Sequence, residues 1–291
     1  MLNGEQQFIL RENGFKGYND REAPEQLGKS YLADCLNALC KTGEIVKRNG
    51  YTIIGTDVGS ANIQGLRGVE FANGTKELIF VANGIAYKWT GSGSSTALSG
   101  TYTLSTTADV DIVVANNAAY FFDGTNTVPK YNGTTMSTVS AIPIGTNARW
   151  FHNQLHIFGI SGTPNKLRSS TIGDPEDHST GTFSNLDNNP NDGDIITGFG
   201  TLKDELIILK RYRAWAASGF GTAALDLDNI GERVTGTGTL APKSVISDGN
   251  NLYFLSFYGG IPHFRAITRT DNGVLVDGGI ISLDIETTMN G

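Results

Sequence analysis

Charged side chains are scarce in this chain, since Asp, Glu, Lys and Arg make up only 18% of its 291 residues. The 22 basic residues are outnumbered by 29 acidic ones, and a net charge of −7 gives no electrostatic case for nucleic-acid binding. No stretch reaches the roughly 18 apolar residues of a membrane-spanning helix, and the first residues lack the pattern of an export signal. We therefore expect no membrane partner and no sequence-specific nucleic-acid partner.

Cysteine is almost absent, with only Cys35 and Cys40 in the segment SYLADCLNALCK. Apolar residues in this segment recur at helical spacing, which predicts a short amphipathic helix around residues 30–41. On a helix, two cysteines five residues apart point about 140° away from each other, which disfavours both a disulfide and a two-cysteine metal site. We therefore expect both cysteines to be buried free thiols, which fits synthesis of the chain in a reducing cytoplasm.

Signatures of catalysis are also missing. His152 and His156 have the spacing of a zinc-protease helix, but no Glu follows the first histidine and the context indicates a strand. Four residues apart on a strand, the two rings would lie roughly 13 Å apart, too far for one metal. Neither a phosphate-binding loop nor a nucleophile elbow nor a sialidase box occurs. We expect no enzyme, no catalytic residue, no cofactor and no bound metal.

Glycine, in contrast, is abundant at 37 residues, and the chain repeats itself. FVANGIAYKWTG, at residues 80–91, is followed 33 positions later by VVANNAAYFFDG. Each copy has the pattern of a hairpin, with an apolar run, a two-residue turn and a second run. Taking Asn83, Asn116, Asn153, Asp204 and Asn250 as the turn markers, the spacings are 33, 37, 51 and 46. Intervals of this size predict a repeat architecture.

The strand pattern favours an all-β fold, a β-propeller of about five blades. Propeller blades bury their inner strands on both faces and leave outer strands to alternate, whereas a sandwich would alternate more cleanly throughout. Residues 51–72 and 267–286 could together form a closing or extra blade, so six blades, or an incompletely closed ring, stay open as alternatives. Residues 1–50 are expected to form an N-terminal arm with the short helix, and residues 51–291 the propeller.

Two stretches of the chain carry a pattern that goes beyond the hairpin repeat. The first is FKGYNDREAPEQL followed by LADCLNALCKTGEIVKRNGYT, and the second is NKLRSSTIGDPEDHSTGTF followed by DGDIITGFGTLKDELIILKRYRAW. This pattern resembles that of phage virion β-propeller proteins of the neck or tail. The resemblance implies a structural protein of a tailed bacteriophage, assembled in the host cytoplasm and located in the virion. It also implies a ring of copies at the head-to-tail connection or tail, in contact with other neck and tail proteins.

Two segments are the candidate interfaces of such a subunit. The arm could reach a neighbouring chain or pack on its own propeller, and the irregular loop over residues 173–194 is the best candidate to contact a partner. Its acidic residues fit turns better than a calcium loop. The competing function is a propeller that binds host-surface glycans through aromatic residues, and glycan hydrolysis ranks third. The candidate interface residues are Phe8, Ile9, Leu10, Phe15, Tyr18, Asp174, Glu176, Asp177, Asp192 and Asp194.

Overall fold

The fold was analysed in a computed structural model of the chain. It describes residues 16–19, 23, 25–28, 30–32, 38–41, 44–48, 50, 58, 61–179, 183–185, 194–218, 231–258, 261–270 and 274–281. In this part of the chain the only helical element is a single 3-10 turn, η2 (Pro242–Ser244), and the regular structure is otherwise β-strand. The all-β prediction is therefore confirmed. Across these same residues, no helix is long and apolar enough to cross a membrane.

The described residues form five four-stranded antiparallel sheets that follow one another in sequence, here numbered I to V. Sheet I contains β5 (Ile63–Glu70), β6 (Lys76–Ala82), β7 (Ile85–Trp89) and β8 (Thr96–Ala97). Sheet II contains β9 (Asp111–Ala115), β10 (Ala118–Phe122), β11 (Val128–Tyr131) and β12 (Met136–Val139). Sheet III contains β13 (Asn147–Phe151), β14 (Gln154–Phe158), β15 (Lys166–Ser169) and β16 (Phe183–Asn185). Sheet IV contains β17 (Ile196–Leu202), β18 (Glu205–Lys210), β19 (Arg213–Ser218) and β20 (Gly231–Thr235). Sheet V contains β21 (Ile246–Ser247), β22 (Asn251–Tyr258), β23 (Ile261–Arg269) and β24 (Leu275–Ile280).

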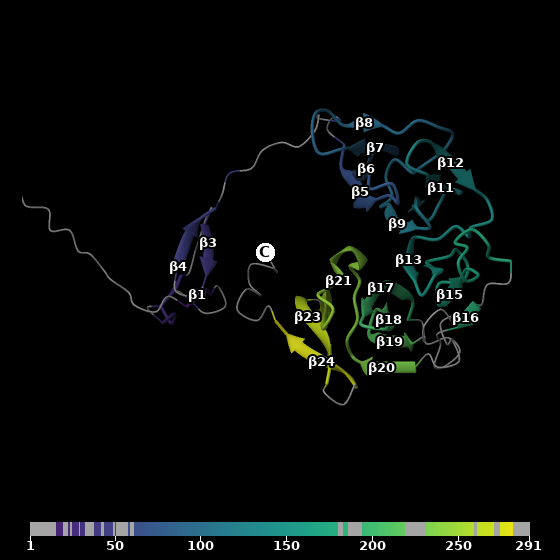
Figure 1. The fold of residues 1–291 in the computed structure, drawn as a ribbon. Helices are drawn as coiled ribbons and strands as arrows, with labels where there is room; N and C mark the ends of the chain where they lie inside the picture. The colour runs from purple at the N-terminus through teal and green to yellow at the C-terminus, as the bar shows by residue number, and fades with distance from the viewer. Residues whose placement is uncertain are drawn as a thin grey trace, which may run out of the picture.

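The sheets are arranged around a common axis, as in a propeller. Figure 1 shows them following an arc from β5–β8 at the top, through the right side, to β21–β24 at the bottom. Within each sheet the first strand lies nearest the middle of the arc and the fourth lies outermost. The inner strands contact one another in succession, β5 with β9, β9 with β13, β13 with β17, and β17 with β21.

The predicted hairpin turns are present where Asn and Gly occur. Asn83 and Gly84 connect β6 to β7 with φ angles of 49° and 72°, and Asn116 and Asn117 connect β9 to β10 with 42° and 61°. Positive φ at both turn residues is the geometry that matches the twist of paired strands, and Asn and Gly are the residues that tolerate it.

The two halves of the 33-residue repeat, however, occupy different places in their sheets. The turn at Asn83 joins the second and third strands of sheet I, whereas the turn at Asn116 joins the first and second strands of sheet II. The equivalent turn of sheet I lies at Asn73, 43 residues before Asn116. Residues 63–70 and 275–280 are consequently strands of sheets I and V rather than parts of an extra blade.

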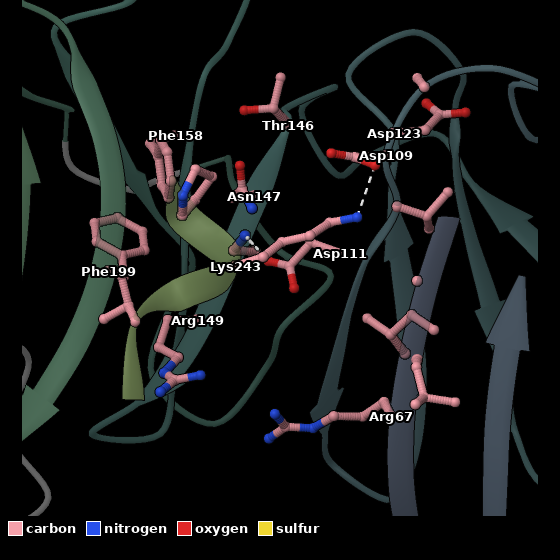
Figure 2. Close-up of a pocket in the computed structure, with 18 of the residues that line it drawn as sticks. Arg67, Asp109, Asp111, Asp123, Thr146, Asn147, Arg149, Phe158, Phe199 and Lys243 are labelled. Carbon is pink, nitrogen blue, oxygen red and sulfur yellow. Dashed lines mark hydrogen bonds and ion pairs between the residues drawn. The ribbon is translucent and has the colours of Figure 1, made fainter. Parts of the chain in front are cut away.

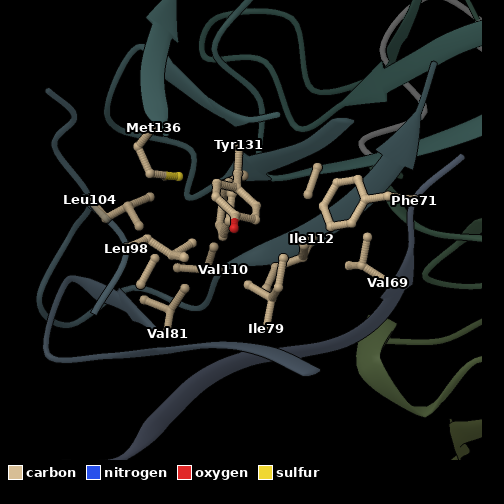
Figure 3. Close-up of a cluster of buried hydrophobic side chains, with 13 residues drawn as sticks. Val69, Phe71, Ile79, Val81, Leu98, Leu104, Val110, Ile112, Tyr131 and Met136 are labelled. Carbon is tan, nitrogen blue, oxygen red and sulfur yellow. The ribbon is translucent and has the colours of Figure 1, made fainter. Parts of the chain in front are cut away.

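Hydrophobic clusters fill the spaces between successive sheets. Between sheets I and II, buried side chains such as Val69 and Ile79 pack against Ile112 and Tyr131, as Figure 3 shows. Three further clusters join sheets II and III, III and IV, and IV and V. The second strands β10 and β14 are buried along their whole length, which matches the predicted covering of both faces.

The predicted helix of the arm is wrong. The chain instead forms an antiparallel hairpin of β3 (Ala38–Lys41) and β4 (Glu44–Lys47), with Cys40 opposite Ile45. Apolar residues at helical spacing fit a short strand equally well, and the β-branched residues of β4 favour a sheet. Before the hairpin, β1 (Gly17–Tyr18) pairs in parallel with β2 (Tyr31–Leu32). Between this arm and sheet I, most of residues 49–60 lie outside the described residues, so the domain boundary at residue 50 stays a prediction.

Candidate functional site

The first sheet of the arc has an apolar face that is partly exposed to solvent. Cross-strand pairing places Leu66, Phe80 and Tyr87 side by side on this face, and the last two rings stack with centroids 5.3 Å apart. Leu66 is 61% exposed and Ile63 is 50% exposed. We call this surface the open face of sheet I. It consists of Ile63, Leu66, Leu78, Phe80, Ala82, Ile85, Tyr87 and Trp89, of which Phe80 and Ala82 are themselves buried.

The last sheet of the arc has a matching apolar face. Leu252 and Phe254 point toward sheet IV and are fully buried. The alternate residues of β22, such as Tyr253 and Leu255, therefore point the other way. Ile246 on this other side is 65% exposed and Phe264 is 39% exposed. We call this surface the open face of sheet V. It consists of Ile246, Tyr253, Leu255, Phe257, Pro262, Phe264 and Ala266, of which Ala266 is itself buried.

The residues of these two faces are of the kind found between sheets. β6 of sheet I reads KELIFVA and is apolar on both faces, a pattern that strands show when another layer covers each side. Among the described residues, only one of its faces packs on a neighbouring sheet, through Ile79 and Val81. Contiguous exposed apolar surface is uncommon on soluble monomers and usually marks an interaction site. The two open faces are therefore the best candidate interface in the molecule.

Sheets V and I approach each other only at the inner rim of the arc, as far as the described residues show. Lys243, in η2 just before β21, donates a hydrogen bond to the backbone carbonyl of Gln64 in β5, with an Nζ–O distance of 2.8 Å. The same ammonium group lies 2.7 Å from the carboxylate of Asp109. The two open faces thus flank one opening, which we call the open side of the arc and which lies between β21–β24 and β5–β8 in Figure 1.

A hollow of about 390 Å³ lies at one end of sheet I, where β5 ends and β6 begins. Gly68, Leu78 and Trp89 line it, and these residues are paired across β5, β6 and β7. Because Gly68 has no side chain, the surface is recessed between its neighbours. The hollow is large enough to accept an apolar side chain from another element.

A second candidate site is a cavity of about 610 Å³ on the axis of the arc. Figure 2 shows residues of the inner strands around it, and they include both basic and acidic groups. Asp111 of β9 accepts a hydrogen bond from the backbone N–H of Ala148, 3.0 Å away. Burial raises the pKa of Asp111. Burial also lowers the pKa of Arg149, and the positive charge of Arg67 lowers it further. The charged residues lining the cavity are Arg67, Asp109, Asp111, Asp123, Arg149 and Lys243.

The histidines do not form a reactive site. His156 is fully buried, its Nδ1 lies 2.8 Å from the hydroxyl of Ser169, and burial lowers its pKa to about 4. Ser169 is itself 1% exposed, so a substrate has no access to this serine and histidine pair. His152 lies in the turn before β14 rather than beside His156. Within the described residues no group of three or more His, Cys, Asp or Glu is placed to hold a metal ion.

The acidic residues at the start of the predicted partner loop contact their own chain. Glu176 accepts a hydrogen bond from the hydroxyl of Tyr120 at 2.9 Å and forms an ion pair with Lys130, so it ties the loop to sheet II. Asp174 accepts the backbone N–H of Glu176, and Asp177 accepts the backbone N–H of Ser179, as turn-forming residues do.

The other end of this loop is also anchored. Asp194 is 6% exposed and accepts the backbone N–H groups of Arg211 and Tyr212. Asp192 lies outside the described residues, as do residues 186–191. The carboxylates of the described part thus fasten the loop to sheets II and IV, and its contact with a partner stays a prediction.

Of the predicted arm contacts, Tyr18 belongs to the described residues. Phe8, Ile9, Leu10 and Phe15 lie outside the described residues. Tyr18 belongs to β1, where its backbone pairs with Leu32.

Comparison with known proteins gives structural similarity only. Neither the family models nor the curated proteins contain a match to this chain. Among solved structures, the chain is similar to virginiamycin B lyase from Staphylococcus aureus, at 15% identity and a TM-score of 0.49, over 81% of this chain and 73% of the other. It is also similar to Hsv2 from Kluyveromyces lactis, at 10% identity and a TM-score of 0.42, over 83% and 76%. A protein from Lactobacillus plantarum matches at 10% identity and a TM-score of 0.43, over 68% and 62%.

Sequence reasoning missed both candidate sites. The sequence does contain a signal for the open face of sheet I, because the alternation of Ile85, Tyr87 and Trp89 puts three large apolar side chains on one face of a strand. That pattern predicts a covered face but does not tell whether the covering sheet belongs to the same chain. The cavity had no local signal, since Arg67, Asp111 and Arg149 are separated by about 40 residues each and meet only because their strands are all innermost.

Proposed function

We propose that this chain is a structural virion protein of a tailed bacteriophage. In this proposal the five sheets are the blades of a propeller that is open between sheets V and I, and neighbouring copies complete one another in a ring at the neck or tail. The observation that carries the proposal is the pair of apolar open faces, since a subunit with such surfaces gains free energy by association. The resemblance of residues 15–52 and 165–215 to phage neck and tail propellers supplies the biological context.

The occupant we propose for the open side is the β3–β4 hairpin of a second copy. Ile45 and Val46 are adjacent in β4 and are 51% and 36% exposed. Adjacent residues of a strand point to opposite faces, so one of the two can contact sheet I while the other contacts sheet V. Figure 1 draws this hairpin clear of the sheets of its own chain.

Such a contact has the symmetry that a ring requires. The donating hairpin and the receiving open side are different surfaces of the same chain, so the contact is heterologous and repeats from copy to copy. Covering the exposed parts of Ile63, Leu66 and Ile246 contributes on the order of 1 kcal/mol each. Several such side chains are needed, because association also costs translational and rotational freedom.

The experiment that tests assembly compares substitutions on and off the open faces. Leu66→Glu and Ile246→Glu place a charge on the open faces of sheets I and V, and Ile172→Glu is the control. Ile172 is 47% exposed, comparable with the other two, but lies in the turn before Asp174 and away from the open side. Light scattering after size-exclusion chromatography should show oligomers for the natural chain and the control, and mainly monomers for both open-face variants.

Two outcomes would contradict the assembly proposal. One is a monomeric natural chain at every concentration reached, as expected if the hairpin fills the open side of its own copy. The other is an equal loss of oligomers in all three variants. The phage context is tested separately by electron microscopy of virions decorated with antibodies against the chain, which should label the neck or tail. Unlabelled virions, together with glycan binding by the isolated monomer, would favour the glycan-recognition alternative.

A further inference from the structure

Two arginines lie close together on the axis of the arc, and they share a single carboxylate, so their positive charge is not fully balanced. Arg67 comes from β5 of sheet I and Arg149 from β13 of sheet III, and Figure 2 shows both at the same end of the central cavity. They are close enough that the charge of Arg67 lowers the pKa of Arg149. The acidic group they share is Asp111, which lies on β9 between their two strands and interacts with both.

A smaller cavity of about 360 Å³ extends from this point. It shares Arg67, Asp111 and Arg149 with the central cavity and adds Lys203, which lies in the turn between β17 and β18. Its lining therefore contains three cationic side chains and one carboxylate. The basic lining contrasts with the net charge of −7 of the whole chain.

The other carboxylates that line the central cavity interact with groups other than the two arginines. Asp109 forms an ion pair with Lys243, at 2.7 Å. Asp123 accepts backbone N–H groups from Ser105 and Thr125, at 2.8 and 2.9 Å, which fixes it in the turn after β10. Asp111 itself accepts a backbone N–H group, and burial raises its pKa, which favours its neutral form. A positive charge in a partly buried place needs a counterion, and guanidinium groups bind oxyanions through paired hydrogen bonds.

We propose that Arg67, Arg149 and Lys203 bind a small oxyanion of the phosphate class on the propeller axis. Two guanidinium groups from opposite strands can each donate two hydrogen bonds to a tetrahedral anion, and the flexible lysine supplies a third positive charge. The site is distinct from the proposed assembly surface, because Arg67 and Arg149 lie on inner strands, Lys203 lies in the turn after β17, and none of the three belongs to the open faces. The anion is either free phosphate or a phosphate group carried by a larger molecule.

Isothermal titration of the full-length chain with inorganic phosphate, at low salt, tests the site. Arg149→Gln and Arg67→Gln should each weaken binding about tenfold or more, which corresponds to the loss of one charge-assisted hydrogen bond. Lys76→Gln is the matched control, since it removes one positive charge from an exposed position of sheet I that lines neither axial cavity. The control should bind phosphate as the natural chain does.

The design keeps a folding defect apart from a binding defect. Arg149→Lys retains the charge but not the paired donors, and it should bind more weakly than the natural chain at unchanged melting temperature. Titration with a nucleoside monophosphate distinguishes free phosphate from a phosphate group of a larger molecule. A site for the latter binds the nucleotide more tightly than it binds inorganic phosphate. The proposal is overturned if neither ligand binds, or if Lys76→Gln weakens binding as much as Arg149→Gln. The open-face variant Ile246→Glu should still bind phosphate, because Ile246 lines neither axial cavity, so failure of the assembly proposal would not affect this result.

Discussion

The ammonium group of Lys243 lies 2.8 Å from the backbone carbonyl of Gln64, although the two residues are 179 positions apart in the chain. This hydrogen bond joins η2, the 3-10 turn that precedes sheet V, to the first strand of sheet I. Gln64 in turn holds the connection to sheet II, because its side-chain amide donates to the carbonyl of Ser105 and its side-chain oxygen accepts the N–H of Gly84. The inner rim therefore connects the two ends of the arc.

Replacing Lys243 should loosen this rim without unfolding the protein. Lys243 and Asp109 are 52% and 78% exposed at their side chains, and exposed ion pairs contribute little. We expect Lys243→Met to lower the free energy of unfolding by about 1 kcal/mol or less. Amide hydrogen exchange in β5 and β21 should become faster, as measured by mass spectrometry. Lys243→Arg should keep slow exchange, and unchanged exchange in Lys243→Met would contradict the contact.

The two faces of sheet I should respond differently to truncation. Ile79 is fully buried against sheet II, whereas Leu66 on the neighbouring strand is 61% exposed on the open face. Ile79→Ala should cost about 2 to 5 kcal/mol of unfolding free energy, and Leu66→Ala less than about 1 kcal/mol in the monomer. Urea unfolding at low protein concentration measures both. Equal losses would mean that the open face is covered within the chain.

Alanine substitutions at two glycines of β5 test how closely sheets I and II approach each other. A Cβ added to Gly65 would lie 2.2 Å from the backbone carbonyl oxygen of Val110, whereas a Cβ added to Gly68 meets nothing within 4 Å. We expect Gly65→Ala to destabilise the protein by about 1 to 3 kcal/mol. Gly68→Ala should be neutral or stabilise it by up to about 1 kcal/mol, because alanine reduces the freedom of the unfolded chain. Thermal melting curves of the two variants give the comparison, and a reversed order would rule out this packing.

The stability of the protein should depend on pH through His156. Burial lowers its pKa to about 4, whereas the unfolded side chain titrates near 6.5. Between these values only the unfolded chain binds the proton, so stability that is fully present above pH 6.5 is lost as the pH falls toward 4. The loss from this group is on the order of 3 kcal/mol. Urea unfolding from pH 7.5 to 4.5 should show a shallower pH dependence for His156→Gln, and identical slopes would exclude the effect.

Much of the fold could be predicted because its signals are local. An Asn-Gly pair between apolar runs, as at Asn83 and Gly84, indicates a tight hairpin, and the burial of β10 and β18 is indicated by apolar residues on both of their faces. The position of a hairpin within its sheet was not predictable in the same way. The turns at Asn83 and Asn116 have nearly the same sequence, and only pairing with distant strands makes one of them the second turn of its sheet and the other the first.

The arm and the candidate sites illustrate what the sequence does not determine locally. Leu39 and Cys40 fit a helix by spacing, but they belong to a strand, because pairing with β4 decides between two conformations of similar intrinsic preference. The arginine pair depends on the order in which the sheets surround the axis, and no short motif encodes that order. The open faces were visible as apolar strands, but their exposure follows from the arrangement of all five sheets.

The central claim is that the open side of the arc receives the hairpin of a neighbouring copy. Electron cryomicroscopy of the assembled full-length chain tests it most directly, since side-chain density can be traced from β4 to β5 in every copy. Our account predicts a closed ring of copies in which Ile45 and Val46 of one chain lie between Leu66 and Ile246 of the next. A map in which the open side is empty, or is filled by the hairpin of the same chain, would contradict it.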